Sequence, residues 1–505
     1  MIRVATTLLW LGVVSHAFLP PPASSIIRPA ARRVSTTSTS SYNKLFLSAP
    51  ATTYGSSYYS IDIDENAYRD IPALEEWAAN CGVQRHQGFQ LVPTTSTMAS
   101  SSTDDDSSED YLQLVYSKDV SVITTEPIPA GTNVLVVPKE MILSAQAIMQ
   151  EFGIAEAAEK ILAGMPSPQK KELFCTFYLM AKILVEVEAG TASPYFPWLN
   201  SLPRFFSNGA SMTPLCFECL PPLVSSLAME ERTNCRSLSA NAVDKFPFLS
   251  QETRNNKELC QWAFQIASTR SFRAVVGDNT EDEDYYDLRI VPMCDMFNHG
   301  SSSSDNSDGS DGESTDIAIQ YDGEGNCYAQ ATRDIPAGSP LRTLYGDPTN
   351  PSFLLARYGF VDETAPATFC KLMIPHVDAM LQDMGYAPHR MLFYKDTGEV
   401  SPEVFDVILY QILASNNAKQ RRDFYRAHMN SDEETKTAFH QHYWPETSAK
   451  LLHHIDSFVQ DLDKLAAKTT RTNNDIQQHP RLPLIWKHND FVRKTFALVR
   501  ARYFE

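Results

Sequence analysis

The sequence predicts an α+β protein in which short strands flank a long helical insertion and a second, all-α region follows. The strand signals are short β-like runs, which lie at 112–116, 120–124, 133–137 and within 288–343. Between them, from about residue 143 to 269, apolar residues recur at helical spacing, and this spacing returns beyond residue 375. Strands and helices thus occupy separate stretches of the chain, which is typical of the α+β class.

The composition excludes several classes of protein. The chain has 505 residues, of which 43% are hydrophobic, and nine cysteines scattered along its length. These values exclude a chain disordered throughout, a collagen, a coiled coil and a small disulfide scaffold. The net charge of −18 disfavours a nucleic-acid partner, because phosphate binding needs clustered Lys and Arg. The odd number of cysteines favours reduced thiols over a disulfide framework.

Residues 1–61 differ from the rest of the chain, because they contain basic residues and no acidic one. A charged start, the apolar run 4–14 and the small residues after it predict a signal peptide over residues 1–17. The basic, Ser/Thr/Ala/Pro-rich residues 18–61 predict a transit peptide, and Phe18 after the cleavage point is similar to presequences of algae with secondary plastids. We therefore expect plastid delivery, with secretion as the alternative, and no membrane attachment after the presequence is removed.

Two Ser/Asp-rich tracts, at 94–110 and 300–313, have too few apolar residues to pack. We predict that both are disordered loops. The second tract contains Asp, Asn and Gly, as calcium loops do, but its spacing does not match the EF-hand pattern. The sequence therefore predicts no metal site.

The remaining elements follow from local patterns. Pro129-Ala130-Gly131 predicts a turn before strand 133–137, and the same Ile-Pro-Ala-Gly sequence returns at 335–338. Residues 171–188 predict a core helix rather than a membrane span, because charged residues interrupt their apolar body. The apolar residues of 451–465 fall on one helical face, which needs a partner surface. We therefore predict a separate helical domain over 375–505.

The sequence contains no Walker loop, no HExxH and no Gly-x-Ser-x-Gly motif. The polar motifs that could carry chemistry instead lie within about ninety residues. In order, they are Ser268-Thr269-Arg270-Ser271-Phe272, Val291-Pro292-Met293-Cys294-Asp295-Met296-Phe297-Asn298-His299, Leu344-Tyr345-Gly346-Asp347 and Tyr358-Gly359-Phe360. Each piece alone is ordinary, but their order and spacing are not.

In these motifs the sequence resembles the SET-domain methyltransferases, specifically the branch of the plant Rubisco large-subunit lysine methyltransferase and the animal actin-histidine methyltransferase. The resemblance runs from about Leu74 to Phe360 and includes the Tyr195-Phe196-Pro197-Trp198-Leu199-Asn200 segment. It implies a knot-like SET β domain over 62–374, interrupted by the helical insertion. It also implies that the helical domain 375–505 binds the protein substrate.

The resemblance also implies a cofactor, S-adenosylmethionine, and a role for each matching residue. Arg270 would hold the carboxylate of the cofactor, Asn298 and His299 its amino group and adenine, and Phe360 would pack near the adenine. Phe272 and Tyr358 would line the channel that admits a lysine. Asp295 matches an acidic site residue of the branch, although capping of the Asn-His turn is an equal alternative.

The chemistry of the reaction gives Tyr345 its expected catalytic role. Methyl transfer from a sulfonium is an in-line displacement, so the site must align a neutral amine and exclude water. A free lysine has a pKa near 10.4 and must lose its proton before it attacks. A tyrosine hydroxyl and backbone carbonyls can then orient the nitrogen and the polarised methyl group.

One departure from the family pattern concerns the segment where the backbone passes close to the cofactor. The family has Gly-x-Gly there, and this chain has Asp119-Val120-Ser121, with Val120 as the expected cofactor contact. Glycine suits such a place because no Cβ intrudes on the ligand and unusual φ and ψ angles are free. The two side chains would weaken cofactor binding or indicate a shifted alignment.

The sequence thus predicts a plastid protein-lysine methyltransferase, and the resemblance suggests Rubisco large subunit or fructose-bisphosphate aldolase as substrates. A protein-histidine methyltransferase is the first alternative, since the branch includes that activity. The second is a catalytically degenerate SET protein that acts as an interaction module, which Asp119 and Ser121 favour.

Overall fold

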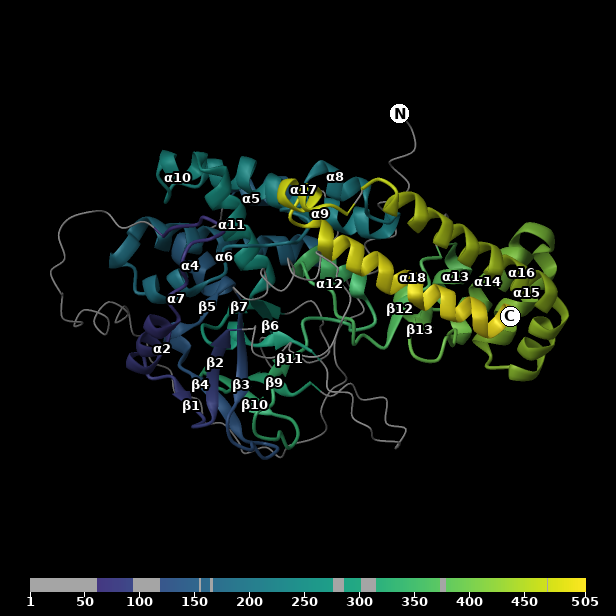
Figure 1. Ribbon diagram of the computed structural model, residues 1–505, viewed down its shortest axis with the longest axis horizontal. Coiled ribbons are helices and arrows are strands. Elements are labelled where there is room, and N and C mark those ends of the chain that lie inside the picture. The colour runs from purple at the N-terminus through teal and green to yellow at the C-terminus, as the bar shows by residue number, and fades with distance from the viewer. Residues whose placement is uncertain are drawn as a thin grey trace, which may run out of the picture.

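The computed structural model describes residues 61–93, 119–153, 156–163, 167–275, 286–300, 315–372, 378–469 and 471–505. Five expectations lie outside these residues: the two targeting segments apart from Ile61, both acidic tracts apart from Gly300, and the strand at 112–116. The model has the expected α+β class, with strands and an inserted helical layer in one lobe and helices in the other (Figure 1).

The strands form small antiparallel sheets. Their bounds are β1 (Gln84–Arg85), β2 (Phe89–Pro93), β3 (Val120–Thr124), β4 (Asn133–Val137), β5 (Leu143–Ser144), β6 (Ser271–Val275), β7 (Tyr286–Ile290), β9 (Ile317–Tyr321) and β10 (Cys327–Ala331). The sheet orders are β1-β4-β10-β9, β2-β3 and β5-β7-β6. The strands predicted at 120–124 and 133–137 are confirmed as β3 and β4.

A parallel pair of short strands joins two segments that are distant in the sequence. β8 (Asn298–His299) pairs with β11 (Arg342–Thr343), so that Arg342 lies opposite Asn298. The residues just before β11 also bind β3, because the Leu341 N–H donates to the Val122 carbonyl at 2.8 Å. The segment before residue 345 therefore lies between β3 and β8, which gives the knot-like arrangement expected of the β domain.

The two Ile-Pro-Ala-Gly sequences pair with each other. Ile128 and Ile335 form an antiparallel bridge with hydrogen bonds of 2.9 and 2.8 Å in the two directions. Each sequence ends in a glycine, Gly131 or Gly338, with a φ of +80°. A residue with a Cβ is strained in that conformation, which explains the glycine in both turns.

The helical insertion packs on the strands and shares one core with them. Its helices are α4 (Ala145–Phe152), α5 (Glu156–Leu162), α6 (Ser167–Ala189), α7 (Phe196–Ser201), α8 (Pro214–Glu218), α9 (Pro222–Ser237), α10 (Gln251–Asn255) and α11 (Lys257–Thr269). The predicted core helix is confirmed as α6, whose Phe177, Leu179 and Ile183 are buried among residues from β4 and β7. A short helix before the strands, α2 (Ile71–Asn80), joins this core through Leu74.

The second lobe has a hydrophobic core of its own. Its helices are α13 (Ala379–Asp383), α14 (Pro402–Asn416), α15 (Ala418–Met429), α16 (Glu433–Ala466) and most of α18 (Leu482–Phe504). The short helix α17 (Asn473–Gln478) instead packs with α8 and α9 of the first lobe through Ile476. The predicted apolar stripe is confirmed on α16, where Leu451, Ile455 and Leu462 are buried.

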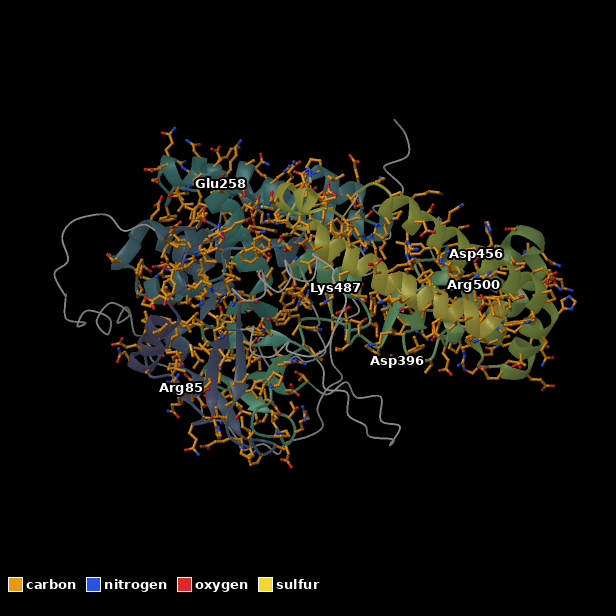
Figure 2. All side chains as sticks on the ribbon, in the orientation of Figure 1. Arg85, Glu258, Asp396, Asp456, Lys487 and Arg500 are labelled. Carbon is orange, nitrogen blue, oxygen red and sulfur yellow. The ribbon has the colours of Figure 1, made fainter. Side chains whose placement is uncertain are left out.

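The last helix, α18, joins the two lobes (Figure 1). Its first residues pack with α8, α9 and α12 (Pro351–Tyr358), whereas Phe491 and the apolar residues after it belong to the core of the second lobe. Ion pairs hold the helix along its length: Lys487 binds Glu363, and Arg500 binds Asp456 of α16 (Figure 2). The lobes therefore share one continuous element.

The second lobe differs from the expectation in one respect. It is not purely helical, because β13 (Leu392–Tyr394) pairs with β12 (Ala367–Phe369), and its core includes Ala365. The expected boundary at residue 375 followed the helical pattern, and a three-residue strand is too short to show in such a pattern. Among the described residues, no helix combines the length and apolarity needed to cross a membrane.

Candidate active site

Four aromatic side chains from motifs that are distant in the sequence lie together beside the paired strands β8 and β11. The ring of Tyr345 lies 4.9 Å from that of Tyr358, 5.5 Å from that of His299 and 6.1 Å from that of Phe360. The His299 and Phe360 rings are 5.3 Å apart. The structure therefore brings four of the expected site residues into one cluster.

Tyr345 is fixed by three hydrogen bonds. Its hydroxyl donates to the Phe297 carbonyl at 2.5 Å, and its backbone N–H donates to Nδ1 of His299 at 3.0 Å. Its own carbonyl accepts from the Tyr358 hydroxyl at 3.0 Å. Burial raises the pKa of the Tyr345 phenol, so the hydroxyl keeps its proton at physiological pH.

His299 is a neutral imidazole in this environment. Burial lowers its pKa to about 4, although the nearby Asp362 carboxylate opposes the shift. Because Nδ1 accepts a hydrogen bond from Tyr345, the single proton belongs on Nε2. That atom lies 3.7 Å from Oδ2 of Asp362, and neither atom has a hydrogen-bond partner among the described residues.

Asn298 ties β8 to the segment that replaces the family's glycines. Its Nδ2 donates to the Val120 carbonyl at 3.2 Å and to Oγ of Ser121 at 3.0 Å, which uses both amide hydrogens. Its amide oxygen is then the group suited to an amine ligand. Val120 and Ser121 belong to extended strand β3, and neither has a positive φ, so this backbone does not require glycine.

Arg270 and Asp295 form an ion pair behind the aromatic cluster. Arg270 follows α11, and its guanidinium donates to the Asp295 carbonyl at 2.5 Å and to Oδ2 at 3.3 Å. The indole of Trp198 donates to the same oxygen at 3.1 Å. The Asp295 side chain has no exposed surface, and burial raises the pKa of its carboxyl, which Arg270 opposes.

This geometry corrects one expectation for Asp295. Its Oδ2 accepts from Arg270 and Trp198 and its Oδ1 is buried without a hydrogen-bond partner among the described residues, so the carboxylate does not cap the Asn-His turn, while its role as an acidic site residue stays a prediction. The channel role expected for Phe272 has no direct support either. Phe272 lies in β6 and packs against the main core, without a ring contact to the Tyr345 cluster among the described residues.

Tyr358 ends helix α12 and is placed by a tight turn. Asn350 caps the start of α12 by accepting from the Phe353 N–H, and Gly359 ends it with a φ of +79°. A Cβ on Gly359 would lie 2.6 Å from the Asn208 backbone nitrogen. Arg357, next to Tyr358, donates to the Ser268 carbonyl and binds Glu172 and Glu231, which ties α12 to the segment before Arg270.

Three residues around the site had no role predicted from the sequence: Arg69, Trp198 and Asp362. Arg69 donates from its guanidinium to Asp119 at 3.1 Å, and it stands alone as a cation within the acidic stretch 62–76. Trp198 lies inside the 195–200 segment, and Asp362 comes two residues after Phe360. These positions marked the three residues as candidates, but the sequence did not reveal their partners, because the contacts of Arg69 and Trp198 join segments 50 and 97 residues apart.

The chemistry available around the cluster is that of hydrogen bonding and charge. All nine cysteines are free, as expected, and among the described residues no group of three or more His, Cys, Asp or Glu side chains is placed to hold a metal ion. The cluster and the residues around it instead offer two guanidinium groups, an amide, a neutral imidazole and aromatic rings in tilted and edge-on contact. These groups suit an organic ligand with a carboxylate, an amine and a flat ring.

The arrangement of strands, inserted helices and helical C-terminal region is similar to that of solved SET-domain structures. One similar solved structure is the SET domain of LSMT bound to lysine and AdoHcy, with a TM-score of 0.51 and 12% identity over 86% of this chain and 90% of that chain. Another is Rubisco LSMT bound to AdoMet, with a TM-score of 0.50 and 13% identity over 86% of this chain and 92% of that chain. The predicted SET fold is therefore confirmed, while the specific branch stays a prediction. No protein-family model matches the sequence, and no curated protein sequence matches it.

Proposed function

We propose that this protein is an S-adenosylmethionine-dependent protein methyltransferase that acts on lysine. The observation that carries the proposal is that Asn298, His299 and Tyr345 lie together at the β8–β11 strand pair of a SET fold. Support also comes from the two similar structures, one bound to AdoMet and the other to lysine and AdoHcy.

The residues around the β8–β11 strand pair fit this cofactor. Arg270 supplies a cation for its carboxylate, and the Asn298 amide oxygen, left over after both amide hydrogens are used, accepts from its amino group. Phe360, with its ring 5.3 Å from His299, supplies an aromatic face for the adenine. Ser121 does not prevent this fit, since its hydroxyl is turned to Asn298.

In this proposal the protein aligns the reactants and does not act as a base. S-adenosylmethionine supplies a methyl group on a positively charged sulfur. The Tyr345 hydroxyl stays protonated and is held on the Phe297 carbonyl, so it orients the target nitrogen without removing its proton. The neutral His299 adds no positive charge that would repel the substrate amine. The amine therefore loses its proton to solvent, and the methylation rate should rise with pH toward the pKa of lysine, near 10.4.

The helical region 375–505 is the part of the chain we propose to bind the protein substrate. It has its own core, and α18 joins it to α8, α9 and α12, the last of which ends at Tyr358 of the candidate active site. Rubisco large subunit and fructose-bisphosphate aldolase are the candidate substrates. The test is to incubate each with the enzyme and isotopically labelled S-adenosylmethionine and to locate the label by mass spectrometry. Label on lysine supports the proposal, and label on histidine would replace it with the alternative activity.

We also propose that the protein is delivered to a plastid through the secretory route. The support is the sequence of residues 1–61, which are basic and free of acidic residues. Fusion of residues 1–61 to a fluorescent protein tests the proposal. Fluorescence confined to the plastid is expected, and fluorescence found only in the medium would favour secretion.

A degenerate SET protein that only binds partners is the second candidate, because Asp119 and Ser121 replace the glycines of the family pattern. The two candidates differ in cofactor binding. An interaction module need not bind S-adenosylmethionine, whereas the enzyme must.

A further inference from the structure

Arg69 is a buried cation at the edge of the candidate cofactor site. It lies just before α2, where its Nε donates to the Ser201 carbonyl at 2.7 Å. Its side chain is 9% exposed, and its guanidinium donates to Oδ1 of Asp119 at 3.1 Å. Burial lowers the pKa of Arg69, and Asp119 opposes the shift. The guanidinium therefore donates to a backbone carbonyl through Nε and to a carboxylate through Nη1.

Asp119 is the less constrained partner of this ion pair. Its side chain is 44% exposed, and its Oδ1 accepts from the Val120 N–H at 2.9 Å as well as from Arg69. It precedes β3, whose Val120 and Ser121 bind Asn298. A half-exposed carboxylate at the start of a strand can rotate into solvent at little cost, whereas the buried Arg69 must keep an anionic partner.

The Arg69 and Arg270 guanidinium groups are neighbours. The charge of Arg270 disfavours the charged form of Arg69, and the charge of Asp295 favours it. Oδ2 of Asp295 accepts from Trp198 and Arg270, and its Oδ1 is buried without a hydrogen-bond partner in the described part of the chain, so Asp295 acts on Arg69 through its charge. Two arginines therefore lie close together: Arg270 is paired with a fully buried carboxylate, and Arg69 with a half-exposed one.

We propose that Arg69 is a second carboxylate-binding residue and that Asp119 occupies it until S-adenosylmethionine binds. The cofactor's carboxylate replaces Asp119 on Arg69 and is held between Arg69 and Arg270, while Asp119 turns into solvent. No covalent bond is made or broken, because one carboxylate is exchanged for another as the hydrogen-bond partner of Arg69. Asp119 thus competes with the cofactor and sets its affinity. This inference rests on the proposed function.

The experiment compares two ligands by calorimetric titration of the purified protein. S-adenosylmethionine carries the amino acid tail with its carboxylate, and 5′-methylthioadenosine has the same adenosine without that tail. The variants are Asp119→Asn, Arg69→Gln and the double variant. Asp119→Asn keeps the size of the side chain and the acceptor for Val120 but removes the charge. Asp456→Asn, in the exposed Asp456–Arg500 pair of the second lobe, is the matched charge control (Figure 2).

Asp119→Asn should tighten S-adenosylmethionine binding about two- to fivefold, the range expected when a half-exposed ion pair no longer competes. Arg69→Gln should weaken it about tenfold or more, because a charge-assisted hydrogen bond is lost. The double variant should lose the gain of Asp119→Asn. Binding of 5′-methylthioadenosine should change less than twofold in all variants, and Asp456→Asn should change neither ligand. Thermal melting of each variant verifies that Arg69→Gln still folds.

The outcomes separate this inference from the proposed function. If S-adenosylmethionine binds but Asp119→Asn leaves its affinity unchanged or weaker, the inference is wrong and the proposed function stands. The same holds if the variants shift both ligands equally. If the natural protein binds no S-adenosylmethionine while Asp119→Asn does, the competition is established directly. If neither protein binds it although both are folded, the inference and the proposed function both fail.

Discussion

The phenol of Tyr345 donates a 2.5 Å hydrogen bond to the carbonyl of Phe297, the residue that precedes Asn298. The Tyr345 backbone N–H in turn donates to His299, the residue that follows Asn298. Tyr345 therefore forms hydrogen bonds to the residues on both sides of Asn298, the asparagine that we propose to hold the cofactor. The catalytic candidate and the cofactor-binding candidates form one hydrogen-bonded unit.

Replacement of Tyr345 by Phe should lower the methylation rate about 100-fold or more, the usual cost of losing a polar group preorganised toward the transition state. The aromatic contacts with Tyr358 and Phe360 remain, so the affinity for S-adenosylmethionine should change less than about threefold. Steady-state kinetics gives the first value and calorimetry the second. Unchanged turnover would remove Tyr345 from the catalytic role, and an equal loss of affinity would make it a binding residue.

Replacement of Gly359 by Ala should destabilise the protein more than replacement of Gly338 by Ala. Both glycines have nearly the same φ, +79° and +80°, so both variants carry a left-handed strain of about 1–2 kcal/mol. Only at Gly359 would the new Cβ meet backbone, 2.6 Å from the Asn208 nitrogen, whereas at Gly338 it would meet nothing within 4 Å. The crowding should add about 1–3 kcal/mol. Urea unfolding measures both, and equal losses would contradict the packing of α12 described above.

A buried lysine should make stability depend on pH. Lys371 is 6% exposed, and its ammonium donates to Oγ of Ser352 at 2.5 Å, which lies 3.1 Å from Nε2 of His488 in α18. Burial lowers the pKa of Lys371 to about 7. In the unfolded chain the pKa is near 10.4, so between these values the unfolded chain binds more protons and stability rises with pH.

This rise should amount to about 2 kcal/mol between pH 7 and pH 9. Lys371→Met, which keeps the length of the side chain and removes the titrating group, should lack it. The measurement is the difference between the unfolding free energies of the natural protein and the variant at the two pH values, because other titrating groups cancel in that difference. Parallel pH profiles would show that Lys371 does not titrate as described.

The local elements were predictable because burial leaves a periodic trace in the sequence. The β-branched run at 120–124 became β3, and the apolar stripe at 451–465 became the buried face of α16. The order of the polar motifs was also enough to place Asn298, His299, Tyr345 and Phe360 together. These predictions depended on neighbours along the chain or on motif order.

The contacts that the sequence did not reveal join distant segments. Trp198 fixes Asp295 from 97 residues away, and Arg69 meets Asp119 across 50 residues. Periodicity shows that a face is buried, but it does not show which side chain from another segment will meet it. The strand pair β12–β13 was missed for a related reason, since three residues form no recognisable period.

The most direct test of the central claim is calorimetric titration of the protein with S-adenosylmethionine, alongside the variant Asn298→Ala. Asn298 bonds β3 and offers its amide oxygen to the cofactor's amino group, so its loss should weaken binding about tenfold or more. We expect binding by the natural protein and its loss in a variant whose circular dichroism is unchanged. A folded natural protein that binds no S-adenosylmethionine, or a variant that binds it equally well, would rule out Asn298 as the residue that holds the cofactor in this site.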